Sequence, residues 1–320
     1  MSTPLKQIAV RTLEVVLCLF LADLVIGGFL GHVFFRQTSG KFYRVTYTMD
    51  KAKEDLIIYG SSHAAAHYVP DVFEKELGST CYNGGVAGQQ ILFHTALQTI
   101  ALARRRPKMM VLDVDIYGYY LDKYQYDRLA DLHPYYARHP EAIGKVLDLK
   151  SRLTKYLLRS KLYRFNSTIV HVVRYWLAPQ KDRQGYQATF VEVPRPAHTA
   201  TGRPADRPAA ERRPRTFDPN MFAALEQFIR NAQTSQIDLL LTFSPALHRS
   251  AASHREAIEK LSALAGRLHV RLVSFIDDPD FLEQYELFAD PEHLNDRGAR
   301  LLSKKLTVKI REEFPGRFGK

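Results

Sequence analysis

Residues suited to nucleophilic catalysis stand at places where predicted strands end. A reactive serine needs a base within hydrogen-bond reach, a group that orients the base, and N–H donors for the developing oxyanion. Ser62 follows a short apolar run, while His293 and Asp290 stand three residues apart near the carboxy-terminal end. We predict that His293 takes the proton of Ser62 and that Asp290 orients the imidazole.

Further candidates surround this set. Backbone N–H groups after Ser62 and at Gly85 are predicted oxyanion donors, because glycine permits close backbone approach. Asn83, His63 and His248 also follow predicted strands, so we expect them near the substrate. The histidines have no recognisable ligand spacing. We therefore expect neither a metal nor a cofactor.

Each assignment has a structural alternative. Ser62 also fits a turn residue whose hydroxyl satisfies a backbone group. Asp290 and His293 also fit the start of a helix that Asn295 caps. Only the joint placement of these groups at the first strand, the second strand and a carboxy-terminal loop favours catalysis.

Short strands alternate with helices over most of the chain. Runs dense in Val, Ile and Leu predict strands buried on both faces at Asp55–Ser61, Thr80–Asn83, Lys108–Asp115, Ile237–Ser244 and Arg271–Ile276. Helical patterns lie at Pro70–Leu77, Gln89–Arg105, Phe222–Thr234, Ser253–Arg267 and Asp296–Phe314. This alternation predicts an α/β fold, a flavodoxin-like three-layer sandwich with a mainly parallel five-stranded sheet. Ligands then bind outside the carboxyl ends of the strands.

One region interrupts the alternation. Between the third and fourth strands we predict a helical insertion at 117–218, with helical pieces at Glu141–Leu158 and Phe165–Leu177. Its Pro/Arg-rich part at 194–215 has too little apolar surface to pack and is predicted to be flexible. The whole domain is placed at 55–316, after a polar linker at 36–54.

The apolar run at 12–35 is long enough to cross a bilayer as a helix. Its fifteen Leu, Ile, Val and Phe side chains each favour insertion by about 0.3–0.6 kcal/mol, against a cost of about 3 kcal/mol for Asp23. We predict a tail at 1–11 and a transmembrane helix at 12–35, with a buried amphipathic helix as the alternative. Asp23 and the pattern Gly27-x-x-x-Gly31 indicate that this helix packs against another helix.

The net charge and residue composition limit the classes of partner that the chain is expected to bind. The net charge of +11 suits anionic surroundings, but the basic groups lack the interleaved aromatic residues of a nucleic-acid binding site. We therefore expect no nucleic acid. Cys18 and Cys81, the only cysteines, lie in dissimilar segments and predict neither a disulfide nor a cysteine metal site. The charges that flank 12–35 lean weakly towards a cytoplasmic carboxy-terminal domain.

With these motifs together, the chain resembles the SGNH/GDSL hydrolase superfamily from about Asp55 to Arg311, without the insertion. Gly60-Ser61-Ser62-His63 matches the nucleophile block, with Ser61 in place of the usual aspartate, and Gly85 matches the oxyanion glycine. Asp290-Pro291-Glu292-His293-Leu294-Asn295 matches the block that carries the acid and the base. The third block lacks its asparagine and offers only Asp113 and Asp115, so the family's second oxyanion donor is missing.

With its Gly-Ser-Ser form, its predicted amino-terminal membrane helix and its missing asparagine, the chain is similar to membrane-anchored SGNH proteins of bacterial envelope acylation. Examples are the D-alanine-transfer protein of teichoic acid synthesis and exopolysaccharide acetylation proteins. This resemblance implies a serine acyltransferase or esterase that acts outside the cytoplasmic membrane on envelope or extracellular polysaccharide. It also implies a membrane-bound O-acyltransferase partner, which we expect at Asp23, Gly27 and Gly31. The missing asparagine leaves open a non-catalytic partner or glycan-binding subunit with the same fold.

Overall fold

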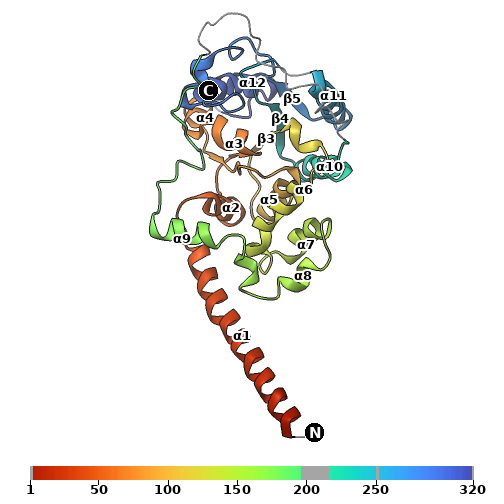
Figure 1. The fold of residues 1–320 in the computed structure, drawn as a ribbon. Coiled ribbons are helices and arrows are strands. Elements are labelled where there is room, and N and C mark those ends of the chain that lie inside the picture. Colours follow the sequence, from red (N-terminus) through yellow and green to blue (C-terminus); the bar gives the residue numbers. More distant parts are fainter. Residues whose placement is uncertain (1–2, 196–215, 250–251, 319–320) are drawn as a thin grey trace, which may run out of the picture. The chain divides into compact units, whose positions relative to one another are not determined.

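The computed structural model describes residues 3–195, 216–249 and 252–318, and it divides into two compact units (Figure 1). Unit 1 comprises the described residues of 1–46 and 126–181, and unit 2 comprises those of 47–125 and 182–320. Most of the predicted flexible segment, at 196–215, lies outside the described residues.

Unit 2 contains five parallel strands in the order β2-β1-β3-β4-β5. They are β1 (Leu56–Tyr59), β2 (Cys81–Asn83), β3 (Met109–Asp113), β4 (Asp238–Phe243) and β5 (Arg271–Ser274). This is the strand order of flavodoxin-like doubly wound folds. Each strand lies within a predicted run, so the α/β prediction with a parallel five-stranded sheet is confirmed.

Helices cover both faces of this sheet. The helices of unit 2 are α3 (Ser62–His67), α4 (Pro70–Leu77), α5 (Ile91–Arg104), η1 (Ile116–Tyr119), α10 (Pro219–Thr234), α11 (Ala252–Arg267), η5 (Tyr285–Leu287) and α12 (Asp296–Glu313). On one face α12 packs against α3 and α4, where Leu302 and Leu306 join Leu56 and Ile58 in one buried core. On the other face α5 packs against α10, and Phe228 contacts Tyr59 with ring centroids 5.4 Å apart.

The end of the predicted insertion belongs to unit 2. The N–H of Gln187 donates to the carbonyl of Ala65 on α3, and the N–H of Val193 donates to the carbonyl of Phe288. The N–H of Asp296 in turn donates to the carbonyl of Thr189. The segment 182–193 therefore lies along the α/β core as an ordered strap, so the separate part of the insertion is only 126–181.

Unit 1 is built mainly from short helices. They are α7 (Pro140–Asp148), η2 (Leu129–Tyr135), α8 (Thr154–Leu157), η3 (Tyr163–Phe165) and α9 (Ile169–Leu177), and they accompany the long α1 (Thr3–Phe35). Phe34 of α1 contacts the rings of Phe42, Tyr135 and Phe165, with centroids 5.2–5.5 Å apart. Two further helices, α2 (Lys41–Asp50) and α6 (Lys123–Arg128), cross the boundaries between the units.

Two sequence predictions need correction here. The predicted linker at 36–54 contains the helix α2, because Phe42, Val45 and Met49 recur at helical spacing and are buried. The end of the predicted span at 12–35 is covered by protein, since Leu30 and Phe34 are buried. α1 itself is long and apolar enough to cross a membrane, and most of it is exposed (Figure 1).

The face of α1 predicted to meet a partner's helix is occupied within the chain. Asp23 accepts hydrogen bonds from the hydroxyl of Ser160 and from the N–H groups of Lys161 and Leu162, the last at 2.8 Å. A Cβ on Gly27 would lie 2.6 Å from the backbone nitrogen of Leu162. The carboxylate and the glycine thus contact a non-helical turn of the same chain, which sequence spacing does not reveal.

Candidate active site

Ser62 stands at a sharp turn between β1 and α3. Gly60, directly after β1, has φ of +139°, and a Cβ there would lie 2.7 Å from the carbonyl oxygen of Asp113. Any other residue would be strained at this position. α3 then begins at Ser62, so the hydroxyl lies at the carboxyl end of the sheet and is half-buried.

The structure brings the three predicted catalytic residues together. Ser62 Oγ lies 2.8 Å from His293 Nε2, and His293 Nδ1 lies 3.0 Å from both carboxylate oxygens of Asp290. An ionised carboxylate only accepts hydrogen bonds, so Nδ1 carries the proton and Nε2 offers its lone pair to the serine hydroxyl. This is the geometry of a nucleophile, a base and an orienting acid.

Asp290 is held as an anion by its own loop. Its Oδ1 accepts the N–H groups of Glu292 and His293, each at 2.9 Å. Burial raises the pKa of Asp290, but these backbone hydrogen bonds and the contact with the His293 imidazole outweigh burial and lower the pKa below its ordinary value. The carboxylate therefore remains ionised and keeps the imidazole oriented.

Two predicted substrate contacts are instead structural. The amide of Asn83 is buried, donates to the carbonyls of Ala64 and Tyr68, and accepts the N–H of Gly85 at 2.9 Å. Asn83 therefore has no group left for substrate. The Gly85 N–H is also engaged, so this structure does not present it to an oxyanion. The glycine is still required, because a Cβ there would lie 2.4 Å from the nitrogen of Ala65.

A buried polar network supports the loop that carries His293. Leu294, the next residue, donates its N–H to His67 Nε2 at 3.0 Å, and His67 Nδ1 lies 3.0 Å from Ser244 Oγ. Ser244 and Tyr68 both donate to Asp113 Oδ2. The network links α3, β3 and the end of β4 to the catalytic loop.

Burial sets the protonation states in this network. It lowers the pKa of His67 well below its ordinary value, and the nearby imidazoles His63 and His293 act in the same direction. His67 therefore stays neutral, as its accepting Nε2 requires. Burial also raises the pKa of Asp113, although His63, Ser244 and Tyr68 oppose the shift.

The third-block position holds an acid that is fully engaged. Asp115 Oδ2 accepts the amide of Gln90 at 2.8 Å and the hydroxyl of Ser61 at 3.3 Å, while its Oδ1 accepts the N–H of Tyr117. Ser61 thus binds the very carboxylate that follows β3. Sequence reasoning found Asp115 but missed Gln90, which has no motif of its own.

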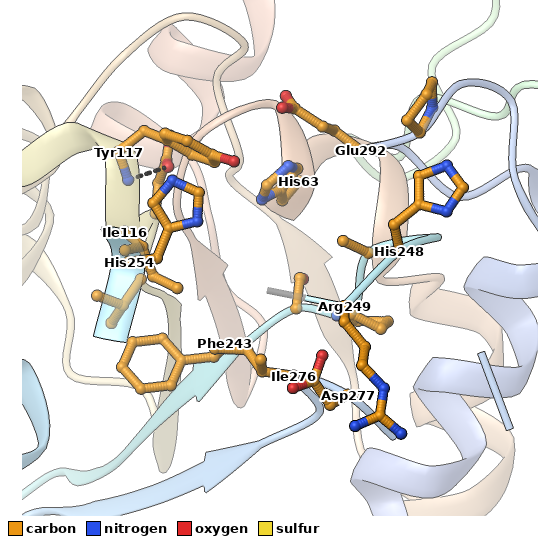
Figure 2. Close-up of a pocket in the computed structure, with 16 residues that line it drawn as sticks. His63, Ile116, Tyr117, Phe243, His248, Arg249, His254, Ile276, Asp277 and Glu292 are labelled. Carbon is orange, nitrogen blue, oxygen red and sulfur yellow. Dashed lines mark hydrogen bonds between the residues drawn. The ribbon is translucent and has the colours of Figure 1, made fainter. Parts of the chain in front are cut away.

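A cavity of about 230 Å³ opens beside these residues (Figure 2). The predicted His63 and His248 both line it, together with Glu292 of the catalytic loop. Figure 2 shows Phe243 and Ile276 forming an apolar wall. His248 Nδ1 also lies 2.9 Å from Glu283, and this hydrogen bond lowers the pKa of the Glu283 carboxyl.

Other lining residues were not predicted. Arg249 follows His248, and His254 packs its ring against Tyr117 at 4.6 Å between centroids. Charge and ring type alone do not separate them from surface residues. Within the described ranges no group of three or more His, Cys, Asp or Glu side chains is arranged to hold a metal ion.

Comparisons with known proteins add only a likeness of fold. No protein-family model and no curated protein matches the chain. An acetyl xylan esterase structure aligns at 14% identity and a TM-score of 0.41, covering 80% of this chain and 99% of that one. A lipolytic protein of the G-D-S-L family from Desulfitobacterium hafniense DCB-2 aligns at 10% identity and a TM-score of 0.40. The alignment covers 79% of this chain and 98% of that one. An acetylxylan esterase from Geobacillus stearothermophilus aligns at 9% identity and a TM-score of 0.41. The alignment covers 84% of this chain and 98% of that one.

Proposed function

We propose that the protein is a membrane-anchored, SGNH-like serine acyltransferase or esterase that acts on cell-envelope or extracellular polysaccharide. The observation that carries the proposal is the contact chain from Ser62 Oγ through His293 to Asp290, at 2.8 and 3.0 Å. These distances are those of a nucleophile activated by a neighbouring base. Among the described residues, His293 is the one imidazole within hydrogen-bond distance of the Ser62 hydroxyl.

The chemistry proceeds in two halves. Ser62 Oγ attacks the acyl carbonyl while its proton passes to His293 Nε2, and His293 returns that proton to the departing oxygen or sulfur. The result is an acyl ester on Ser62. A sugar hydroxyl or water then gives its proton to His293 and attacks the ester carbonyl. The bond between the acyl carbon and Ser62 Oγ breaks, and His293 returns the proton to Oγ, which transfers or hydrolyses the acyl group and restores Ser62.

Stabilisation of the oxyanion falls to the first turn of α3. The first N–H groups of a helix have no acceptor within it, and the helix begins at the nucleophile. We assign this role to the N–H groups of Ser62 and His63 in place of Gly85, whose N–H binds Asn83. Asp115 does not replace the missing asparagine, because it has no N–H group and its oxygens already accept hydrogen bonds from Gln90, Ser61 and Tyr117.

α1 supports the membrane anchor of this proposal. It is long and apolar enough to cross a bilayer, and its large side chains from Leu5 to Phe29 are exposed. We place the α/β domain outside the cytoplasmic membrane, where envelope glycans lie. A membrane-bound O-acyltransferase partner remains part of the proposal, but it would contact a face of α1 other than the one that holds Asp23.

A serine-reactive phosphonate tests the catalytic assignment directly. We expect Ser62→Ala and His293→Ala each to abolish covalent labelling, while Ser167→Ala, which removes an exposed serine of unit 1, labels like the wild type. Circular dichroism and thermal melting verify folding. Undiminished labelling of folded Ser62→Ala would exclude Ser62 as the nucleophile.

A non-catalytic SGNH-like subunit of an acylation or export complex is the second candidate. The engaged Asp115 favours it, because no asparagine donor stands at the third block. Genetic complementation separates the two functions. An enzyme loses function with Ser62→Ala, whereas a scaffold or glycan-binding subunit retains it.

A further inference from the structure

The segment 149–177 of unit 1 exposes apolar side chains that its own unit leaves uncovered. Exposed large side chains occur both on and around α8 and along α9: Leu149, Leu153, Tyr156, Leu157, Ile169, Val170, Val173, Trp176 and Leu177. Val170 and Leu177 are 78% and 70% exposed, whereas Val172 between them is buried. α9 therefore uses one narrow face for its own core and presents the rest outward.

This segment is also strongly basic. Residues 149–181 contain eight Lys or Arg and no Asp or Glu. Lys150 and Lys155 pair with Asp127 and Asp148, but the other basic side chains include exposed ones, Arg152, Arg159, Lys161, Arg174 and Lys181, that form no ion pair with any described residue. Exposed apolar and aromatic side chains mixed with unpaired cations are typical of segments that lie in a membrane interface.

Contacts with α1 fix where this segment lies along the anchor. Ser160, Lys161 and Leu162 bind Asp23, and Trp176 packs edge-on against Phe29 with centroids 6.0 Å apart. The later part of the segment, 160–177, thus lies beside α1 between Asp23 and about Gly31. Figure 1 shows α9 beside the carboxy-terminal end of α1, while α8 lies next to α7 and apart from α1.

The length of the anchor then places the segment in the membrane. Only about 18 Å of helix separates Arg11 from Asp23 at 1.5 Å per residue, whereas the hydrocarbon core is about 30 Å thick. A helix that enters the core after Arg11 leaves it near Gly31. Whatever packs beside Asp23 and Phe29 is therefore at membrane depth.

We propose that residues 149–177 form a membrane-embedded collar around the outer part of α1, with its apolar side chains in the interfacial acyl region and its cations at anionic head groups. This proposal rests on the membrane anchor of the proposed function. The collar explains why Asp23 accepts the N–H groups at the start of the 160–165 turn. These N–H groups need acceptors at a depth where water is scarce. The collar also explains why Lys161 is exposed, since its long stem reaches the head groups.

Trp176 is the only tryptophan of the chain, so the full-length protein carries its own probe. We reconstitute it into phosphatidylcholine–phosphatidylglycerol vesicles and measure Trp176 quenching by lipids brominated near the carbonyl, by lipids brominated deep in the chain, and by aqueous acrylamide. We expect the strongest quenching from the shallow bromines and protection from acrylamide.

Variants test whether the exposed apolar face is responsible. Val170→Asp with Leu177→Asp should reduce quenching by shallow bromines and increase quenching by acrylamide. The matched control Val308→Asp, at an exposed valine of α12 in unit 2, should behave like the wild type. Leu153→Trp in a Trp176→Phe background repeats the measurement beside α8 and should show the same shallow quenching.

The outcomes separate the collar from the anchor. If the protein floats with alkali-washed vesicles but Trp176 is quenched by acrylamide and not by bromines, the collar is wrong and the anchor stands. Protection from both quenchers would mean that protein, such as a second copy, covers the face, and this also overturns the collar. Protein that fails to float with the vesicles contradicts the anchor itself.

Discussion

His67 Nε2 accepts the backbone N–H of Leu294 at 3.0 Å, and Leu294 directly follows His293. The bond ties the loop that carries His293, the proposed base, to the helix that begins at Ser62, the proposed nucleophile, so one buried side chain holds both elements. His67 touches neither the serine hydroxyl nor the orienting carboxylate in the hydrogen bonds described here. It acts as a positioning residue.

Replacing His67 should therefore separate positioning from folding. His67→Phe keeps a ring of similar size but leaves the Leu294 N–H without its acceptor, which costs about 1–3 kcal/mol of folding free energy. A displacement of the imidazole near 1 Å lowers catalytic rates about 100-fold. We expect the phosphonate labelling rate of folded His67→Phe to fall by that order, at unchanged affinity for the reagent.

His67→Gln provides the control, because its side-chain oxygen can accept the Leu294 N–H again. Partial recovery of the labelling rate supports positioning. Wild-type labelling by His67→Phe, measured on folded protein, would rule out that role.

Asp113 predicts a pH dependence of stability. Burial raises its pKa in the folded protein above the ordinary 3.8, so the folded state binds this proton more tightly than the unfolded state. Stability from this group is present below pH 3.8 and falls as the pH rises through the higher, folded-state pKa. Asp113→Asn removes the titration while keeping an oxygen for Tyr68 and Ser244.

Urea unfolding of both proteins between pH 3.5 and about 8 measures this effect. As the pH rises, we expect the unfolding free energy of the wild type to fall relative to that of Asp113→Asn. Asp122→Asn, which removes an exposed carboxyl, corrects for the loss of one negative charge. Parallel profiles for Asp113→Asn and the wild type would show that the buried carboxyl does not carry the predicted shift.

Fusions at the carboxy-terminal end test the proposed topology. We expect alkaline phosphatase joined after Lys320 to be active and a green fluorescent protein there, exported by the general secretory route, to be dark. The flanking charges lean weakly the other way, so the outcome is informative. The reverse pattern would place the domain in the cytoplasm and remove envelope glycan as the substrate.

The strands, and the meeting of Ser62, His293 and Asp290 at one place, could be predicted because their signals are local. Buried parallel strands are continuous apolar runs, and Pro70 and Gly78 mark both ends of α4. Ser62, His293 and Asp290 follow such elements, so the topology alone brings them to one edge of the sheet.

The predictions that the structure corrects concern the groups that individual side chains contact. Asn83 has the same sequence position whether its amide meets substrate or, as here, the carbonyl of Ala64. The many polar residues of 36–54 predict a linker, because they hide the helical spacing of Phe42, Val45 and Met49. No sequence signal connects Asp23 with Ser160, since that pair arises from tertiary packing across 137 positions.

That separation has a consequence for biosynthesis. Asp23 leaves the ribosome 137 residues before the serine that caps it, which at bacterial or eukaryotic elongation speeds of about 5–20 residues per second is about 7–27 s. During that interval the Asp23 carboxylate lacks the three hydrogen-bond donors that Ser160, Lys161 and Leu162 supply in the folded chain. The contacts between α1 and this turn can therefore form only after residue 162 has been made, long after α1 itself.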